Sequence, residues 1–158
     1  MKAIVKTNAA RLLDKAKIQY SLVEYTVDLD NLAATHVAEE LGENIKQVFK
    51  TLVLKSDKGS YYVCVIPGDA ELNLKTVARL SLSKKVELIP MKDLLSVIGY
   101  LRGACSPIGM KKPFPVFIHN SCLEFNYIYI SAGARGLQLK ISPKDLINFV
   151  LAKVEYLL

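Results

Sequence analysis

The chain has 158 residues, about the length of one domain with a single continuous core. Apolar residues make up 51% and charged residues 23%, which is ordinary for a folded globular protein and excludes a disordered chain. The excess of 21 Lys and Arg over 15 Asp and Glu gives a formal charge of +6, which permits a nucleic-acid partner without requiring one.

The three cysteines, Cys64, Cys105 and Cys122, are widely spaced and odd in number. This pattern suggests neither a zinc site nor a disulfide framework, and we expect no metal and no cofactor. The apolar patch at the N-terminus is too short for the core of a signal peptide, and no later segment approaches the length of a membrane span. We therefore expect a cytoplasmic protein.

The first elements are predicted from the spacing of apolar residues. Helical spacing predicts a helix over 8–16, and strict alternation predicts a strand over 21–27. A short helix over 35–41 follows a polar loop, with Thr35 as its N-cap and Gly42 as the residue that ends it.

The middle of the chain begins with two apolar runs, 48–54 and 61–66, which are rich in β-branched and aromatic residues. The five residues SDKGS join them and include Gly59, so we expect a β-hairpin. The next predicted elements are a helix around 74–78, a strand over 86–90, and a helix over 91–98 that ends at Gly99.

The last third opens with a loop over 99–113, which has three glycines and two prolines and therefore demanding backbone geometry. Short strands are predicted at 115–119, 127–131 and 137–141, with the turn AGARG before the last of them. Ser142, Pro143 and Asp145 form a strong helix start. The irregular order of strands and helices predicts a single mixed α/β domain over residues 1–158.

Lys50 is unusual because it lies in the middle of an apolar strand. Alternation places it on the same face as Val48, Leu52 and Leu54. Its ammonium must either reach solvent along its own stem or meet an anionic or polar partner. The residues alone leave both readings open: a lysine at a strand edge, or a lysine that lines a pocket and holds a substrate oxygen.

Other candidates are weaker when taken one at a time. Glycines such as Gly103 let backbone N–H groups approach a ligand, although the loop matches no known phosphate-binding motif. Arg135 could contact a phosphate or a surface carboxylate. Cys105 lacks a neighbouring base and is expected to be a passive thiol. His36 is expected on a helix surface and His119 at a strand end.

Four blocks of sequence together resemble the YbaK/EbsC family. They are VFKTLVL (48–54), GYLRGACSPIGMKK (99–112), the run over 120–125, and YISAGARGLQLKISPKDL (129–146). The resemblance covers nearly the whole chain. It implies a curved, barrel-like mixed sheet flanked by helices, and an activity that releases an amino acid wrongly attached to proline tRNA. Members are free-standing editing proteins or editing domains of bacterial prolyl-tRNA synthetases.

The resemblance also implies site residues. The family's essential lysine falls on Lys50, its pocket glycine on Gly103, and the tyrosine at the end of its first strand on Tyr25. The implied substrate-binding residues are Gly99, Ser106, Pro107, Gly109, Ser131, Gly133, Arg135, Gly136 and Gln138. The candidate phosphate contacts are Arg102, Lys111, Lys112 and Arg135.

Two positions depart from the family pattern. Ala134 stands where a lysine is frequent, and Gln138 stands where an aspartate is often close to the substrate. Glutamine at this position is also found in the EbsC branch, so the departure bears on substrate identity more than on activity. In the mechanism that the resemblance implies, the thiol of a cysteinyl substrate attacks its own ester carbonyl, and no protein nucleophile is needed.

The resulting hypothesis is a Cys-tRNA(Pro) deacylase that acts in trans, with proline tRNA as its partner and prolyl-tRNA synthetase as a further candidate partner. The alternatives are an Ala-tRNA(Pro) deacylase and a non-catalytic regulatory or binding module of the EbsC type.

Overall fold

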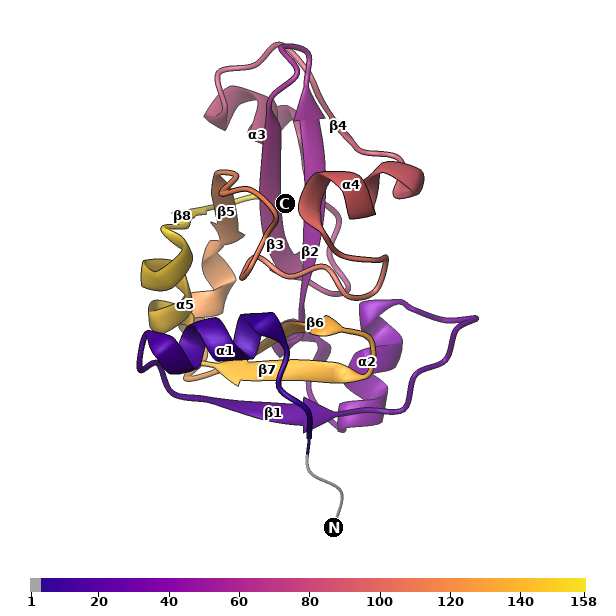
Figure 1. Cartoon of the computed structure of the whole chain (residues 1–158). Helices are drawn as coiled ribbons and strands as arrows, with labels where there is room; N and C mark the ends of the chain where they lie inside the picture. The colour runs from indigo at the N-terminus through magenta and orange to yellow at the C-terminus, as the bar shows by residue number, and fades with distance from the viewer. Residues whose placement is uncertain (1–3) are drawn as a thin grey trace.

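The computed structural model describes residues 4–158 and shows a mixed α/β domain (Figure 1). The α-helices are α1 (Asn8–Lys15), α2 (Ala34–Leu41), α3 (Leu74–Leu80), α4 (Leu94–Ile98) and α5 (Pro143–Val150). The strands are β1 (Tyr20–Glu24), β2 (Phe49–Ser56), β3 (Tyr61–Pro67), β4 (Val86–Leu88), β5 (Val116–His119), β6 (Ile128–Ala134), β7 (Leu137–Ile141) and β8 (Lys153–Glu155). Short 3-10 helices occur at Ile45–Gln47, Met91–Asp93 and Asn120–Glu124.

Local sequence signals set several of these boundaries. The side chain of Ser142 accepts a hydrogen bond from the backbone N–H of Asp145, and Pro143 occupies the first turn of α5, as predicted. Gly42 and Gly99 end α2 and α4 in the left-handed conformation, with φ of 67° and 88°. Glycine adopts this conformation at low cost because it has no Cβ, so both ends could be read from the sequence.

The strands form two sheets that meet at the base of β2. The order is β1-β7-β6 in the smaller sheet and β4-β2-β3-β5-β8 in the larger one. In the larger sheet β2 and β3 form an antiparallel hairpin, whereas β5 pairs in parallel with both β3 and β8. Val48 forms a bridge to Tyr129 between the two sheets. The smaller sheet lies across the foot of the hairpin (Figure 1).

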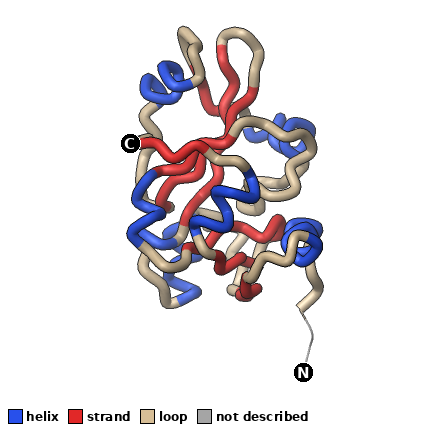
Figure 2. The backbone as a smooth tube through the Cα atoms, turned by 90° about the vertical axis from the view of Figure 1, so that its left-hand side faces the viewer, coloured by secondary structure: helices blue, strands red, loops and turns tan. Residues whose placement is uncertain are grey.

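Two hydrophobic clusters cover opposite faces of the larger sheet. The main core contains Val63, Val65 and Ile118 and extends to the smaller sheet and α1. The second cluster contains Cys64, Ile66 and residues of α3. Because β3 is covered on both faces, its sequence is apolar throughout rather than alternating. Burying each large aliphatic side chain here contributes about 1.5–3 kcal/mol before entropy is counted. Helices lie around the outside of the strands (Figure 2).

The prediction of a mixed α/β domain is confirmed, but several details differ. The strands form two sheets that do not close into a barrel, instead of one barrel-like sheet. The first strand ends at Glu24 rather than at position 27. Thr35 lies inside α2, where Ala33 is the N-cap and makes no side-chain cap bond. Strand β8 was not predicted, because a three-residue strand is defined only by its partner β5.

Among residues 4–158 there is no helix with the length and apolar character needed to cross a membrane.

Candidate functional site

A cavity of about 430 Å³ opens beside β2. It is enclosed by β2, the start of α2, the end of β4 with the segment that follows it, the glycine-rich loop over 99–110, and one residue each of β6 and β7. Its lining residues are Leu32, Ala33, Ala34, Val37, Val48–Val53, Gly68, Leu88, Ile89, Met91, Leu94, Arg102, Gly103, Cys105, Ser131 and Gln138. The lining is mostly apolar with a few convergent polar groups, as in sites that bind small ligands.

The cavity exists because the outer edge of β2 is only partly covered. Strand β4 pairs with residues Leu54–Ser56 of β2 and leaves the earlier part of this edge open. The carbonyl of Val53 accepts a hydrogen bond from Ile89 N–H on this edge at 3.1 Å. Because backbone groups alternate between the two edges of a strand, the N–H and C=O of Thr51 lie on this same edge, beyond the part that β4 covers.

Lys50 is half-buried at the wall of this cavity. No carboxylate of residues 4–158 lies within 4.0 Å of its Nζ; the nearby Asp69 is paired instead with Lys46 at 2.7 Å. Burial lowers the pKa of Lys50, and the negative charges of Asp69 and Glu71 partly oppose this shift. The ammonium is thus held in the wall without a bound counter-ion, which suits it for an oxygen of a ligand.

The glycine-rich loop is fastened by three side chains. Ser131 Oγ donates to the carbonyl of Ala104 at 2.9 Å, and Arg135 Nε donates to the carbonyl of Arg102 at 2.8 Å. Tyr100 donates its hydroxyl to the carbonyl of Ile108. These bonds occupy three carbonyls of the loop and fix the backbone around Gly103.

Gly103 lies where a side chain would be strained. Its φ is +85°, and a Cβ there would lie 3.4 Å from Leu32 and 3.6 Å from Arg135 Nε. Among the hydrogen bonds of the described residues there is none from the Gly103 N–H. Gly103 thus lines the cavity with a backbone N–H that has no partner among residues 4–158, a group that an oxyanion-binding site uses.

Ser131 and Gln138 face one another across β6 and β7 in the same register, and both line the cavity. The register shifts between Ser131 and Ala134, which marks a β-bulge. Gly133 sits in this bulge at φ +95°, and a Cβ there would lie 2.9 Å from the ring of Tyr100. The bulge thus makes room for Tyr100, in line with the frequent use of bulges beside functional sites.

Two buried oxygens of the cavity walls lack a hydrogen-bond donor. They are Thr51 Oγ1 and Gln138 Oε1. Gln138 is only 5% exposed, so water cannot easily satisfy its amide. An unpaired buried polar group costs about 1–3 kcal/mol, so these atoms indicate a ligand that brings donors of its own.

The structure brings four of the twelve predicted site residues together at the cavity: Lys50, Gly103, Ser131 and Gln138. The other eight, Tyr25, Gly99, Ser106, Pro107, Gly109, Gly133, Arg135 and Gly136, do not line it. Several of these shape the loop from behind: Gly99 ends α4, Ser106 Oγ accepts from Ile108 N–H at 3.2 Å, and Gly109 would clash with Tyr100 if it had a Cβ.

Other expectations can be compared with the structure directly. Arg135 contacts a backbone carbonyl rather than a surface carboxylate. Tyr25 packs in the cluster around α2, and its N–H donates to the carbonyl of Gly136. His119 is at the end of β5, as predicted, but it is buried and accepts a hydrogen bond from Leu157 N–H at 3.1 Å. His36 lies half-buried on α2.

Cys105 lines the cavity as a protonated thiol. Burial raises its pKa to about 11, and its sulfur lies 3.7 Å from the carbonyl of Leu101 as a weak donor. A thiol of this kind is a poor nucleophile near neutral pH. No group of three or more His, Cys, Asp and Glu side chains placed to hold a metal ion occurs within the part of the chain that the structure describes.

Sequence reasoning missed Thr51 and Gly68. Thr51 follows Lys50 in the same block, and its position on an uncovered strand edge could not be read from alternation. Gly68 has an ordinary φ, but a Cβ there would lie 2.6 Å from Ala34 Cβ and 2.9 Å from the carbonyl of Val48. It therefore allows α2 to pack against the end of the hairpin, and only the tertiary contact reveals this.

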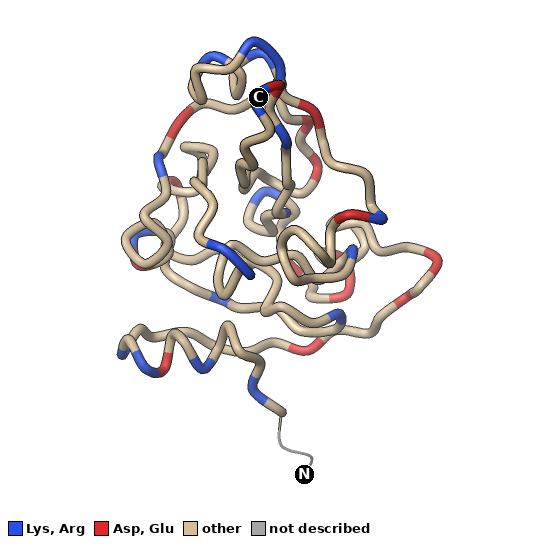
Figure 3. Tube along the Cα trace, turned by 45° about the horizontal axis from the view of Figure 1, so that its top comes forward, with Lys and Arg blue, Asp and Glu red and all other residues tan. Residues whose placement is uncertain are grey.

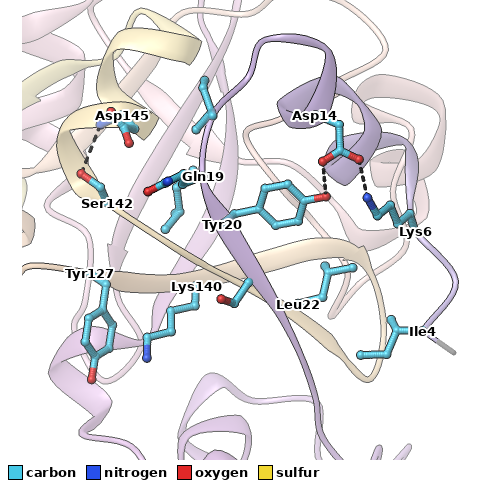
Figure 4. A pocket seen from close by; sticks show the side chains of 13 residues that line it. Ile4, Lys6, Asp14, Gln19, Tyr20, Leu22, Tyr127, Lys140, Ser142 and Asp145 are labelled. Atoms are coloured by element: carbon cyan, nitrogen blue, oxygen red, sulfur yellow. Dashed lines mark hydrogen bonds and ion pairs between the residues drawn. The ribbon is translucent and has the colours of Figure 1, made fainter. Parts of the chain in front are cut away.

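A second, larger hollow of about 930 Å³ lies along β1, between α1 and the start of α5 (Figure 4). Three of its four charged side chains, Lys6, Asp14 and Lys140, already have partners within the protein. Lys6 and Tyr20 donate to the two oxygens of Asp14 at 2.7 and 2.8 Å. The ammonium of Lys140 lies 4.0 Å from the centre of the Tyr127 ring. Most of its charges are thus used within the protein, and we consider it the weaker candidate despite its size.

Comparison with known proteins shows which family the sequence resembles. The model of the aminoacyl-tRNA editing domain family matches residues 31–149. A protein of Enterococcus faecalis named as a candidate Cys-tRNA(Pro)/Cys-tRNA(Cys) deacylase, EbsC, is 43% identical over 90% of this chain and 87% of its own. The prolyl-tRNA editing protein ProX of Acetoanaerobium sticklandii is 30% identical over 62% of this chain and 58% of its own.

Among solved structures, a candidate trans-editing enzyme for prolyl tRNA synthetase has the same fold. It superposes with a TM-score of 0.81 over 97% of this chain and 98% of its own, at 21% identity. The family model and the EbsC relative span most of this sequence. The chain therefore belongs to the YbaK/EbsC family of aminoacyl-tRNA editing domains.

Proposed function

We propose that this protein is a deacylase that acts in trans on Cys-tRNA(Pro), with the whole chain as one editing domain. The observation that carries this proposal is the complementarity between the cavity beside β2 and an aminoacyl ester. The cavity offers a cation and a free N–H, Lys50 and Gly103, together with two unpaired buried oxygens, Thr51 Oγ1 and Gln138 Oε1.

An aminoacyl ester presents the opposite groups. Its carbonyl and ribose oxygens accept hydrogen bonds, and its α-ammonium and a cysteine thiol donate them. In our proposal Lys50 and Gly103 N–H hold the ester oxygens and stabilise the oxyanion that develops on the carbonyl. The oxygens of Thr51 and Gln138 accept hydrogen bonds from the α-ammonium and the thiol of the amino acid. In our proposal these two acceptors favour an amino acid with a small polar side chain, such as cysteine.

The proposed reaction needs no nucleophile from the protein, consistent with the protonated state of Cys105. The substrate sulfur attacks the ester carbonyl carbon and forms a C–S bond, while the bond from that carbon to the ribose oxygen breaks. The thiol proton ends on the ribose oxygen, so the products are a cyclic cysteine thiolactone and free tRNA. The protein contributes positioning and charge stabilisation, the two largest sources of rate for an already activated ester.

The partners follow from this reaction. The substrate is a charged tRNA, proline tRNA in our proposal, met in the cytoplasm where such tRNAs are used. In our proposal the cavity contacts mainly the amino acid. Prolyl-tRNA synthetase is therefore a suitable partner for selecting the tRNA.

The direct test is a deacylation assay with Cys-tRNA(Pro) and Ala-tRNA(Pro), comparing the wild type, Lys50→Ala and the control Lys153→Ala, whose exposed lysine lies on β8. We expect faster release from Cys-tRNA(Pro), lost in Lys50→Ala and retained in Lys153→Ala. If neither substrate were released faster than the spontaneous rate, the hypothesis of an enzyme would be excluded. The alternative of a non-catalytic regulatory module would then remain. A preference for Ala-tRNA(Pro) would replace the specificity and keep the reaction class.

The mechanism has a separate test. An S-methylcysteinyl ester of the same tRNA lacks the attacking thiol, so we expect its release to stay at the spontaneous rate. Rapid release of this substrate would exclude attack by the substrate sulfur and would require a water molecule as the nucleophile.

A further inference from the structure

Most of the protein's excess positive charge lies at one end of the molecule. We call this end the basic tip and define it as residues 55–60 and 74–87, which include the β2–β3 turn, α3 and the first two residues of β4. Its cations are Lys55, Lys58, Lys75, Arg79, Lys84 and Lys85, and its carboxylates are Asp57 and Glu87. The tip thus has a net charge of +4 out of the total of +6. Figure 3 shows Lys and Arg segments gathered around this end of the molecule.

The basic tip is a fixed structure rather than a set of independent loops. Asp57 Oδ1 accepts hydrogen bonds from the N–H groups of Lys84 and Lys85 at 3.0 and 3.2 Å. Lys58 Nζ donates to the carbonyl of Leu82 at 3.0 Å, and Asp57 N–H donates to the carbonyl of Lys85 at 2.9 Å. These bonds join the β2–β3 turn to the segment before β4, so the cations of both are presented together.

The other side of the cavity has the opposite charge. The segment over 28–43, which includes α2, contains Asp28, Asp30, Glu39, Glu40 and Glu43 and no lysine or arginine. This segment forms one wall of the cavity through Leu32, Ala33, Ala34 and Val37. A polyanion that enters the cavity is therefore repelled on the α2 side and attracted on the side of the basic tip.

Strand β4 connects the basic tip to the rim of the cavity. Leu88 lines both the cavity and a small hollow of about 170 Å³ whose other residues are Lys55, Ser56, Asp57, Lys85 and Glu87. Lys85 is three residues from Leu88, or about 10 Å along an extended strand. Lys50 and Ser56 are six residues apart on β2, or about 20 Å. This spacing suits an unpaired 3′ end in the cavity followed by a duplex at the tip.

From this charge distribution we infer that the basic tip binds the phosphate backbone of an RNA duplex whose unpaired 3′ end occupies the cavity, so that the RNA leaves over β4 and away from α2. This inference rests on the proposed function and adds the path of the tRNA. Phosphate contacts of this kind do not depend on the RNA sequence. They fix the orientation of the RNA on the protein, while the cavity distinguishes one attached amino acid from another.

The test compares two triple variants of equal net charge. The tip variant replaces Lys75, Arg79 and Lys84 by glutamine; all three are exposed, and their side chains have no hydrogen bond or ion pair with a described residue. The control variant replaces Arg11, Lys15 and Lys144, three exposed cations of α1 and α5, by glutamine. Thermal unfolding is measured for both variants to check that they fold.

The measured quantity is affinity for an RNA hairpin with an unpaired 3′ end and no amino acid, over about 50–200 mM salt. We expect the tip variant to bind at least about tenfold more weakly than the control, and the slope of log K against log salt to fall by roughly three. Equal losses in both variants would show an unspecific charge effect and overturn the inference. Unchanged affinity in the tip variant would overturn it as well, and would leave an acidic protein surface as the occupant to test.

This binding assay involves no reaction, so its result is independent of the deacylation assay. The wild type could fail to deacylate either substrate while the tip variant, and not the control variant, loses affinity for RNA. That result would support the RNA-binding surface and contradict the proposed activity. If deacylation were confirmed and the tip variant bound RNA normally, the activity would stand and the path of the RNA would be wrong.

Discussion

The cavity beside β2 and the hollow along β1 differ in how many of their charged and buried polar groups have partners. In the hollow along β1, Lys6, Tyr20 and Asp14 satisfy one another, and Lys140 lies over an aromatic ring. In the cavity beside β2, Lys50 has no carboxylate partner within the described chain, and two buried oxygens lack donors. The smaller cavity is the better candidate because it holds a cation and two buried oxygens without partners. In the larger hollow, three of the four charged side chains are already paired.

The largest expected effect is a difference in kcat/KM between alanine variants of Lys50 in the cavity and Lys6 in the hollow. Lys50→Ala should reduce kcat/KM for Cys-tRNA(Pro) release by about 100-fold or more, the usual loss when a preorganised oxyanion contact is removed. Lys6→Ala in the hollow should leave kcat/KM within about twofold. Single-turnover kinetics measure both variants. A similar loss in the two variants would contradict the functional difference between the sites.

The next effect concerns the free donor of the glycine-rich loop. Gly103→Ala should cost about 1–2 kcal/mol of backbone strain, because φ is +85°, and should also lower kcat/KM by about tenfold or more. Gly42→Ala provides the control, since its φ is +67° and a Cβ there would meet no atom within 4 Å. Urea unfolding and deacylation rates should show comparable destabilisation in both variants but lost activity only in Gly103→Ala.

Removing one hydroxyl group from each site should change the free energy of unfolding by a smaller amount and in opposite directions. Thr51→Val removes a buried oxygen that has no partner, so we expect the free energy of unfolding to rise by about 1 kcal/mol while kcat/KM falls several-fold. Tyr20→Phe removes a satisfied hydrogen bond, so we expect a loss of about 0.5–1 kcal/mol and unchanged activity. Destabilisation by Thr51→Val would mean that its hydroxyl has a partner, such as water, in the free protein.

The smallest effect is the pH dependence of the hollow. The hydrogen bond from Lys6, and then that from Tyr20, lowers the pKa of Asp14 in the folded protein. The stabilisation from this carboxylate is therefore present above its unfolded pKa of about 3.9 and is lost as pH falls through the lower folded value. Urea midpoints of the wild type and Asp14→Asn should differ slightly at neutral pH and converge in strong acid, with equal deacylation rates at neutral pH.

The sequence by itself determined the elements whose signals are local. The start of α5 needs Ser142, Pro143 and Asp145 within four positions, and the ends of α2 and α4 each need one glycine. The β2–β3 hairpin needs two apolar runs and a five-residue loop. The resemblance added the family, and with it Lys50, Gly103, Ser131 and Gln138 as residues that the fold then brought to one cavity.

Tertiary structure decided everything that depends on contacts between distant segments. The division into two sheets, the parallel pairing of β8 and the open edge of β2 follow from partners that no local pattern specifies. The same holds for Arg135, whose guanidinium fastens the loop at Arg102 instead of meeting an anion. Lys50 illustrates the difference between local and tertiary information. Alternation placed it on a strand face. Only the folded chain shows that the strand edge beside it is uncovered and that no carboxylate of residues 4–158 forms an ion pair with it.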